Sequence, residues 1–249
     1  MDHLIYTAYS GLADSMTRQR VIASNMANAQ TVGFRAETLF STPMTLKANT
    51  SLEARSGTIA EVHGADMTQG SITQTGNALD VAVNGTAMIA VQAQDGTEAY
   101  TRRGDLSVSD TGVLTNGDGR PVIGQGGPIT VPPGATISIS QDGTVLSLAA
   151  DAAKGTQPEA VDQIKLASPD GSTTEKGLDG LFRVYGGGVL PADATATVES
   201  GALEQSNVNP SAVLVSMLDA QRLFDIRTKL VSTAKDVDES GATLMKMPT

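Results

Sequence analysis

Cysteine and tryptophan are absent from the 249 residues, and aromatic residues make up only 3% of the chain. Without cysteine the protein can form no disulfide, no thiolate metal site and no thiol nucleophile. With so few aromatic residues, a buried core has to be packed from Val, Ile, Leu, Ala and Met. This composition favours a β-rich body with small side chains.

Basic residues and long apolar runs are also scarce. The chain has 17 basic and 27 acidic residues, so its net charge is -10. Broad nucleic-acid binding needs a basic surface and is therefore not expected. No apolar run approaches the roughly 20 residues that span a bilayer, so direct membrane insertion is not expected. The start, Met1-Asp2-His3-Leu4, lacks the basic and apolar regions of a cleaved signal peptide. A cytoplasmic protein and one exported without such a peptide would both look like this.

Motifs that would indicate catalysis or cofactor binding are weak or missing. No G-x-S-x-G nucleophile elbow occurs, and the glycine clusters fit no phosphate-binding pattern. Two faint metal-binding patterns are better explained as loop and turn residues: His63 with Asp66, and Asp110 with Asn116 and Asp118. We therefore predict no catalytic, cofactor-binding or metal residue and no enzyme. The alternative of a soluble β-domain glycan-binding protein or enzyme stays open.

The N-terminal segment has the periodicity of a helix. From Leu4 to Ala29 it has no Pro and a single Gly, Gly11. One stripe recurs at spacings of three and four residues: Ile5, Ala8, Leu12, Ser15, Gln19, Ile22, Met26 and Ala29. Asn and Gly between Asn28 and Gly33 suit the exit from a helix.

The C-terminal segment is predicted to be a second helix. Asn209 can cap its first amides, and Pro210 is tolerated at the first helical position. Its stripe contains Ala220, Leu223, Arg227, Leu230, Ala234, Val237, Gly241 and Leu244, widened by Val213, Met217, Phe224 and Val231. This apolar face is broader than a two-stranded seam needs. The two helices could pair with each other or with helices of neighbouring subunits.

The middle of the chain is predicted to be an extended arm followed by a β body. Residues 31–67 show weak periodicity and suggest an arm with short strands. Asn84-Gly85 between two apolar runs predicts a hairpin with a type I′ turn. Further turns are expected at Asp95-Gly96, Asn116–Gly119 and Asp142-Gly143. Closely spaced turns of this kind are typical of an antiparallel sandwich or barrel.

We therefore expect an α+β fold with long N- and C-terminal helices pairing as a coiled-coil-like layer around a central all-β body. The expected domains are a helical assembly domain (1–30 and 209–249), a linker layer (31–68 and 199–208) and a β domain (69–198). The predicted inter-helix contacts are Leu12, Ile22, Met26, Leu223, Phe224 and Leu230. Periodicity alone leaves open whether they act within one subunit or between subunits.

Three groups of motifs resemble the flagellar axial family of rod and hook proteins. The first is Gly11-Leu12 with Ser24-Asn25-Met26-Ala27-Asn28-Ala29-Gln30-Thr31-Val32-Gly33-Phe34. The second is Gly201-Ala202-Leu203-Glu204-Gln205-Ser206-Asn207-Val208-Asn209, followed by Gln221-Arg222-Leu223-Phe224. Between them, Thr75–Gly85 and Tyr100–Leu106 are similar to family blocks. The resemblance covers nearly the whole chain. It departs at Thr86-Ala87, near which relatives usually carry an aromatic pair.

The resemblance implies a structural subunit of the bacterial flagellar basal-body rod, most like a proximal rod protein. A distal rod or hook-like subunit is the alternative. It also implies polymerisation through the terminal helices into a drive shaft that transmits torque, without a cofactor. The implied partners are copies of itself, other rod subunits and the flagellar type III export apparatus, and the implied location is the rod spanning the periplasm. Asn25, Asn28, Thr31, Gly33 and Phe34 match the family's turn motif and are expected to set the exit from the first helix.

Overall fold

The computed structural model describes residues 2–45, 56–149 and 155–245, and the chain divides into two compact units. Unit 1 contains residues 1–27, 37–63 and 209–249, and unit 2 contains residues 28–36 and 64–208. Two long terminal helices and a set of antiparallel sheets between them confirm the predicted α+β class.

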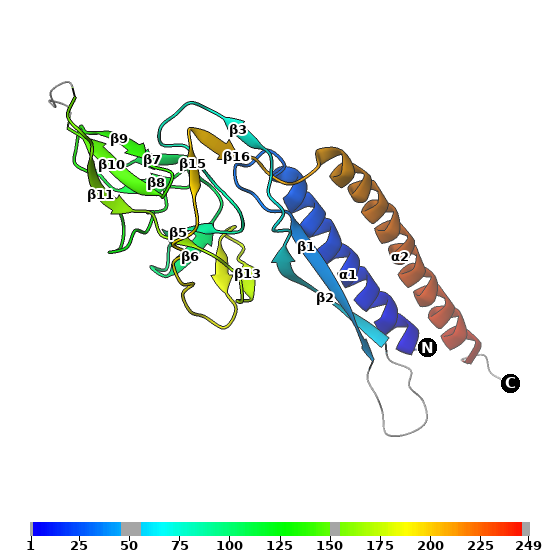
Figure 1. Cartoon of the computed structure of the whole chain (residues 1–249). Helices are drawn as coiled ribbons and strands as arrows, with labels where there is room; N and C mark the ends of the chain where they lie inside the picture. Colours follow the sequence, from blue (N-terminus) through cyan, green and yellow to red (C-terminus); the bar gives the residue numbers. More distant parts are fainter. Residues whose placement is uncertain (1, 46–55, 150–154, 246–249) are drawn as a thin grey trace. The chain divides into compact units, whose positions relative to one another are not determined.

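Unit 1 consists of two helices and a two-stranded sheet. Helix α1 spans Asp2–Ala27 and helix α2 spans Pro210–Met245. They lie side by side with the start of α1 and the end of α2 at the same end (Figure 1), so they run antiparallel. Strands β1 (Glu37–Thr45) and β2 (Ser56–Ala65) form the sheet, and β1 contacts α1. Their lengths of nine and ten residues exceed the short strands expected for this arm.

The inner ends of both helices lie where the sequence predicts them, and α2 has the predicted cap. The Asn209 side chain accepts a hydrogen bond from the Ala212 amide at 3.1 Å, which satisfies one of the free donors at the start of α2. At the other terminus α1 ends at Ala27, and Gly33 then takes a φ of +67°. Both predicted boundaries are confirmed.

Unit 2 is built from short antiparallel strands. A five-stranded sheet has the order β12-β5-β6-β14-β13, a three-stranded sheet has the order β11-β10-β9, and three strand pairs are β15-β4, β16-β3 and β7-β8 (Figure 1). The strands are β3 Ile72–Gln74, β4 Val81–Val83, β5 Met88–Gln92, β6 Glu98–Thr101, β7 Leu106–Val108, β8 Leu114–Asn116, β9 Thr136–Ile139, β10 Thr144–Leu148, β11 Glu159–Gln163, β12 Leu166–Ala167, β13 Thr174–Lys176, β14 Phe182–Val184, β15 Val198–Ser200 and β16 Ala202–Glu204.

Two predicted hairpin turns join neighbouring strands, and a third predicted turn is also present. Asp95-Gly96 connects β5 to β6, and Asp142-Gly143 connects β9 to β10. The Asn116 side chain accepts bonds from the amides of Asp118 and Arg120, so the faint calcium pattern here is a turn. Local turn chemistry determines these three connections.

The hairpin predicted at Asn84-Gly85 is wrong. Strand β4 pairs with β15, whereas β5 pairs with β6 and β12. Gly85 has a φ of +69°, but no described non-glycine residue has a positive φ. Asn84 therefore lacks the backbone conformation that a type I′ turn requires. Pairing with a strand more than 100 residues later replaces the local hairpin.

The core of unit 2 is mostly aliphatic, as the scarcity of aromatic residues predicts. One buried cluster is almost entirely Val, Ile, Leu and Ala, from Val81 to Val198. A second one surrounds Tyr100, Phe182 and Met88. The Tyr100 hydroxyl donates to Glu98 at 2.7 Å and accepts from the Leu190 amide at 2.6 Å, so its polar end is satisfied inside the core.

An ion pair in the β13–β14 turn predicts a small acid sensitivity. Arg183 donates to both carboxylate oxygens of Asp179, at 3.0 and 2.8 Å, and these bonds lower the pKa of Asp179. Because the folded pKa lies below the unfolded value of about 4, the pair stabilises the protein above that pH and the effect is lost as the pH falls through the folded pKa. Both side chains are 30% exposed, so the effect should stay below about 1 kcal/mol.

We expect Asp179→Asn to lower the free energy of unfolding slightly near pH 7 and to match the parent protein near pH 2. Urea denaturation at the two pH values measures this difference. An equal loss at both would show that the carboxylate charge is not involved.

Candidate functional site

The stripe predicted for α1 lies on the covered side of the helix. Ser15 is buried and Leu12, Gln19, Ile22 and Met26 are half-buried. The side chain of Ile5 lies outside the described residues. On α2, Ala220 is buried and the half-buried residues are Val213, Leu223, Phe224, Arg227, Val231 and Ala234. Gly241 and Leu244 lie outside the described side chains.

A second stripe on α1 is exposed and largely apolar. It contains Tyr9, Ala13, Met16, Arg20, Ala23 and Ala27, at alternating spacings of four and three. Tyr9 and Met16 are 69% and 59% exposed. Since 18 residues of helix rise about 27 Å, this surface runs along most of α1. We call it the α1 outer stripe.

Helix α2 also leaves an apolar stripe exposed. Val215, Ile226, Leu230 and Val237 project within about 60° of one another at 100° per residue, and they are 49–62% exposed. We call them the α2 outer stripe. Large apolar residues of this kind, aligned over several turns, mark an interaction surface on a soluble protein.

The six predicted inter-helix residues divide between the covered and exposed faces. Leu230 belongs to the α2 outer stripe, whereas the other five are half-buried in unit 1. Contacts of any of the six with another subunit remain a prediction.

The segment after α1 begins with a compact turn. In unit 1, the Asn25 side chain donates to the Glu37 carbonyl at 3.0 Å and accepts from the Glu37 amide at 2.8 Å. In unit 2, the Thr31 amide and hydroxyl both donate to Asn28, each at 3.1 Å. The Phe34 amide then donates to the Thr31 carbonyl at 3.2 Å. The wider role assigned to these motif residues remains a prediction.

Residues 33–36 are held inside unit 2 by hydrogen bonds that their backbone amides donate. The Gly33 amide donates to the Glu204 carbonyl at 2.8 Å, and the Ala36 amide donates to the Asn207 side chain at 2.7 Å. The same Asn207 side chain donates to the carbonyls of Asp66 and Thr68. One asparagine therefore ties three separate stretches of chain together.

A buried ionic triad lies beside these bonds. Glu204 accepts from Arg35 at 2.7 Å on one carboxylate oxygen and from Arg102 at 2.6 and 2.9 Å on the other. The Gly70 amide adds a fourth bond at 2.9 Å. All three charged side chains are at most 1% exposed. We call Arg35, Arg102 and Glu204 the triad.

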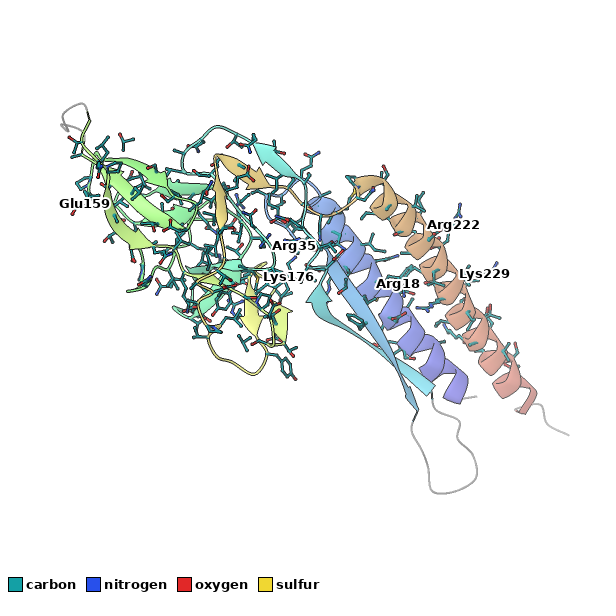
Figure 2. All side chains as sticks on the ribbon, in the orientation of Figure 1. Arg18, Arg35, Glu159, Lys176, Arg222 and Lys229 are labelled. Atoms are coloured by element: carbon teal, nitrogen blue, oxygen red, sulfur yellow. The ribbon has the colours of Figure 1, made fainter. Side chains whose placement is uncertain are left out.

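The triad carries two positive charges and one negative charge away from solvent. Burial lowers the pKa of both Arg35 and Arg102, and the charge of Glu204 opposes this shift. Arg102 also donates to the Val83 carbonyl at 2.8 Å and to the Ala87 carbonyl. Lys176 lies next to Arg35 (Figure 2) and donates to its carbonyl at 2.9 Å. Its ammonium lies 3.5 Å from the centre of the Phe34 ring.

Sequence reasoning missed the triad because its members are far apart in the chain. All three nevertheless lie in or directly beside the motif blocks, within Gly33-Phe34-Arg35-Ala36, Tyr100–Leu106 and Gly201–Asn209. The sequence carried no signal that singled them out, because Tyr100–Leu106 also contains Arg103 and Asp105, which stay partly exposed.

A cavity of about 870 Å³ in unit 2 has four charged side chains in its lining, Glu98, Asp142, Lys165 and Asp193, and each makes a hydrogen bond or ion pair within unit 2. Lys165 is paired with Glu98 at 2.6 Å, and Gln125 donates to Gln163 at 2.7 Å. Among the described residues, no three His, Asp or Glu side chains are grouped to hold a metal ion. The side chain of His63, from the weak metal pattern, lies outside them. No described helix is long and apolar enough to cross a bilayer.

Three family models match successive parts of the chain. The flagella basal body rod protein model matches residues 5–35, the flagellar hook protein FlgE/F/G D1 domain model matches 82–147, and the flagellar basal body rod FlgEFG protein C-terminal model matches 199–244. Arg35, Arg102 and Glu204 fall in the three matches in that order. The triad thus takes one residue from each.

Curated relatives match over nearly the full length. The flagellar basal-body rod protein FlgF of Escherichia coli K12 is 43% identical, with 95% of each chain covered. FlgF of Salmonella typhimurium LT2 is 40% identical over 99% of this chain and 100% of its own, and FlgF of Caulobacter vibrioides is 31% identical over 97% of each. The predicted structural, non-catalytic class is confirmed by these matches, and the chain belongs to the flagellar basal-body rod protein family.

Proposed function

We propose that the chain is a FlgF-type subunit of the proximal rod, which polymerises through its terminal helices into the axial drive shaft that transmits torque. The observation that carries this proposal is the pair of apolar outer stripes on α1 and α2. Similarity to rod proteins named FlgF over 95–100% of both chains supports the type.

Covering the outer stripes supplies the driving force for assembly. Burial of a Leu, Ile or Met side chain contributes about 1.5–3 kcal/mol when it is fully exposed beforehand, and roughly half that here. Tyr9, Met16, Ile226 and Leu230 together therefore offer several kcal/mol per subunit. Head-to-tail contacts of equivalent subunits that do not close into a ring generate a helical filament.

The charge distribution is consistent with assembly through unit 1. Unit 1 has 10 acidic and 9 basic residues, a net charge of -1, whereas unit 2 has 17 acidic and 8 basic residues, a net charge of -9. Nearly neutral helices can approach one another without net repulsion. Like charge on unit 2 disfavours close packing of these units from different copies.

The partners in this proposal are copies of the chain and other rod subunits, and the location is the rod in the periplasm. Export through the flagellar type III apparatus is part of the same proposal. A distal rod or hook-like subunit would have different neighbours. Crosslinking in purified basal bodies, followed by identification of the crosslinked chains, separates the two positions.

Leu230→Asp is expected to prevent incorporation into the rod while leaving the protein folded. Leu230 is 49% exposed, so the free energy of unfolding should change by less than about 1 kcal/mol. At a closed interface, a buried carboxylate without a partner costs about 3 kcal/mol or more, which weakens association by at least about 100-fold. Complementation of a strain lacking the chromosomal gene, scored by swimming and by the content of basal bodies, measures this loss.

Gln221→Asp is the matched control, since Gln221 is exposed on a different side of α2 from the α2 outer stripe. It introduces the same carboxylate and should leave swimming intact. Normal incorporation of Leu230→Asp would show that the α2 outer stripe is not part of the assembly surface.

A further inference from the structure

The seam between α1 and α2 contains a polar cluster at its middle. The Arg227 guanidinium donates through Nη1 to the Asp14 carboxylate at 3.0 Å and to the Ser15 hydroxyl at 2.6 Å. The same nitrogen donates to the carbonyl of Gly11. Asp14 and Ser15 are 6% and 1% exposed and the Arg227 side chain is 28% exposed, so buried acceptors hold a partly exposed cation.

The rest of the covered seam is mostly apolar and repetitive, although Gln19 on the same stripe of α1 is also half-buried. Leu12 and Ile22 on α1 and Leu223 and Val231 on α2 are half-buried in it. Apolar contacts are non-directional, so a seam of this kind fits almost as well after one helix slides by seven residues. Such a slide amounts to about 10 Å along the axis. The apolar residues alone therefore define the seam without defining its register.

The polar cluster discriminates between registers. If Arg227 moved seven residues toward the C-terminal end of α1, the positions facing it would be Arg18, Val21 and Ile22. These side chains offer no acceptor and add a like charge. A slide of seven residues the other way would place Leu4, Thr7 and Ala8 there, with no carboxylate. In either shifted register Arg227 would lose its carboxylate acceptor, so these registers are disfavoured.

We propose that Arg227 is the positioning residue that fixes the register of α2 against α1. Through that register it fixes the relative position of the α1 and α2 outer stripes. The role of these stripes in assembly rests on the proposed function. Polar groups in a covered seam act in this way in coiled coils, where they select register rather than add stability. The surface offered to the next subunit therefore depends on a residue that lies between the helices of unit 1.

Spin-label distances measure the register in the purified full chain. The protein has no cysteine, so Ala23→Cys and Thr233→Cys introduce one labelling site on an exposed position of each helix. In the parent chain we expect one narrow distance distribution. In Arg227→Met, which keeps the length of the side chain, we expect two or more maxima separated by up to about 10 Å, with helical circular dichroism retained. A single unchanged distribution in this variant overturns the proposal.

Arg222→Met is the matched control, because Arg222 is exposed and projects from the side of α2 away from α1 (Figure 2). It should keep the single distribution. The double variant Asp14→Leu/Arg227→Met makes the cluster apolar, so its helices should stay paired without a unique register. Loss of helicity in the double variant would show that the cluster supplies stability instead of register, and would also overturn the proposal.

The distance measurement uses the unassembled protein and so stands apart from the proposed function. If Leu230→Asp incorporates normally but Arg227→Met loses its register, the proposed assembly surface is wrong. The proposed role of Arg227 in setting the register is then still supported. If the register is unchanged in Arg227→Met, the role of Arg227 fails, whatever Leu230→Asp shows.

Discussion

Glu204→Gln is expected to lower the free energy of unfolding of unit 2 by about 3–5 kcal/mol. The substitution keeps the size of the side chain but removes the only negative charge of the triad, so Arg102 stays buried without a counter-charge and Arg35 keeps only the charge of Asp66. The new amide nitrogen also replaces an acceptor with a donor, facing either an arginine or the Gly70 amide. Urea denaturation followed by far-ultraviolet circular dichroism measures the loss.

Glu175→Gln is the control for Glu204→Gln, since it makes the same chemical change at an exposed position of β13. It should alter the free energy of unfolding by less than about 0.5 kcal/mol. If Glu204→Gln changed the free energy of unfolding as little as Glu175→Gln, water or another carboxylate would have to satisfy both arginines. That result would show that the triad does not hold residues 33–36.

Removal of all three charges tests a different point. Arg35→Met/Arg102→Met/Glu204→Leu should be less destabilising than Glu204→Gln, because an apolar cluster leaves no unpaired charge. Arg102 has two further backbone acceptors, Val83 and Ala87, whose loss limits the recovery.

Gly33→Ala is expected to release the segment around Gly33 from unit 2 and to destabilise it by about 3 kcal/mol or more. A Cβ added at Gly33 would lie 2.4 Å from the Arg102 carbonyl carbon and 2.5 Å from the Arg103 nitrogen. These are backbone atoms, so the neighbouring chain cannot move aside as a flexible side chain would. The φ of +67° adds about 1 kcal/mol of strain for any residue with a Cβ. Faster amide hydrogen exchange in residues 31–36 would report the release.

Gly85→Ala separates the two causes in Gly33→Ala. Gly85 has nearly the same φ, +69°, but an added Cβ there would meet no atom within 4 Å. Its substitution should cost only the strain of about 1 kcal/mol. Equal effects at the two positions would show that the close approach of the Arg102 backbone is unimportant.

Both of these predictions concern residues that hold the chain at the point where it leaves α1. The triad takes one residue from each of the three matched segments, and Gly33 packs against the backbone next to Arg102. The blocks that carry the family resemblance therefore converge in unit 2 around residues 33–36. Because the blocks are far apart in the sequence, the sequence alone does not show that they meet around residues 33–36.

The sequence by itself determined the features that depend on neighbouring residues. The cap at Asn209, the exit of α1 near Asn28, the turns at Asp95-Gly96 and Asp142-Gly143, and the helical stripes all follow from propensity and periodicity within a few residues. The aliphatic core follows from composition in the same way. Near-full-length resemblance to one family then followed from the order of the motifs.

Only the tertiary structure decided which partners distant residues take. Strand β4 pairs with β15 instead of forming the expected hairpin with β5, because backbone hydrogen bonds and burial across the fold outweigh a local turn preference. Glu204 forms ion pairs with Arg35 and Arg102, which are more than 100 residues away in the sequence. Arg227 forms an ion pair with Asp14, which is more than 200 residues away. Periodicity identifies which residues of a helix share a face, but burial of that face depends on what the folded chain brings against it.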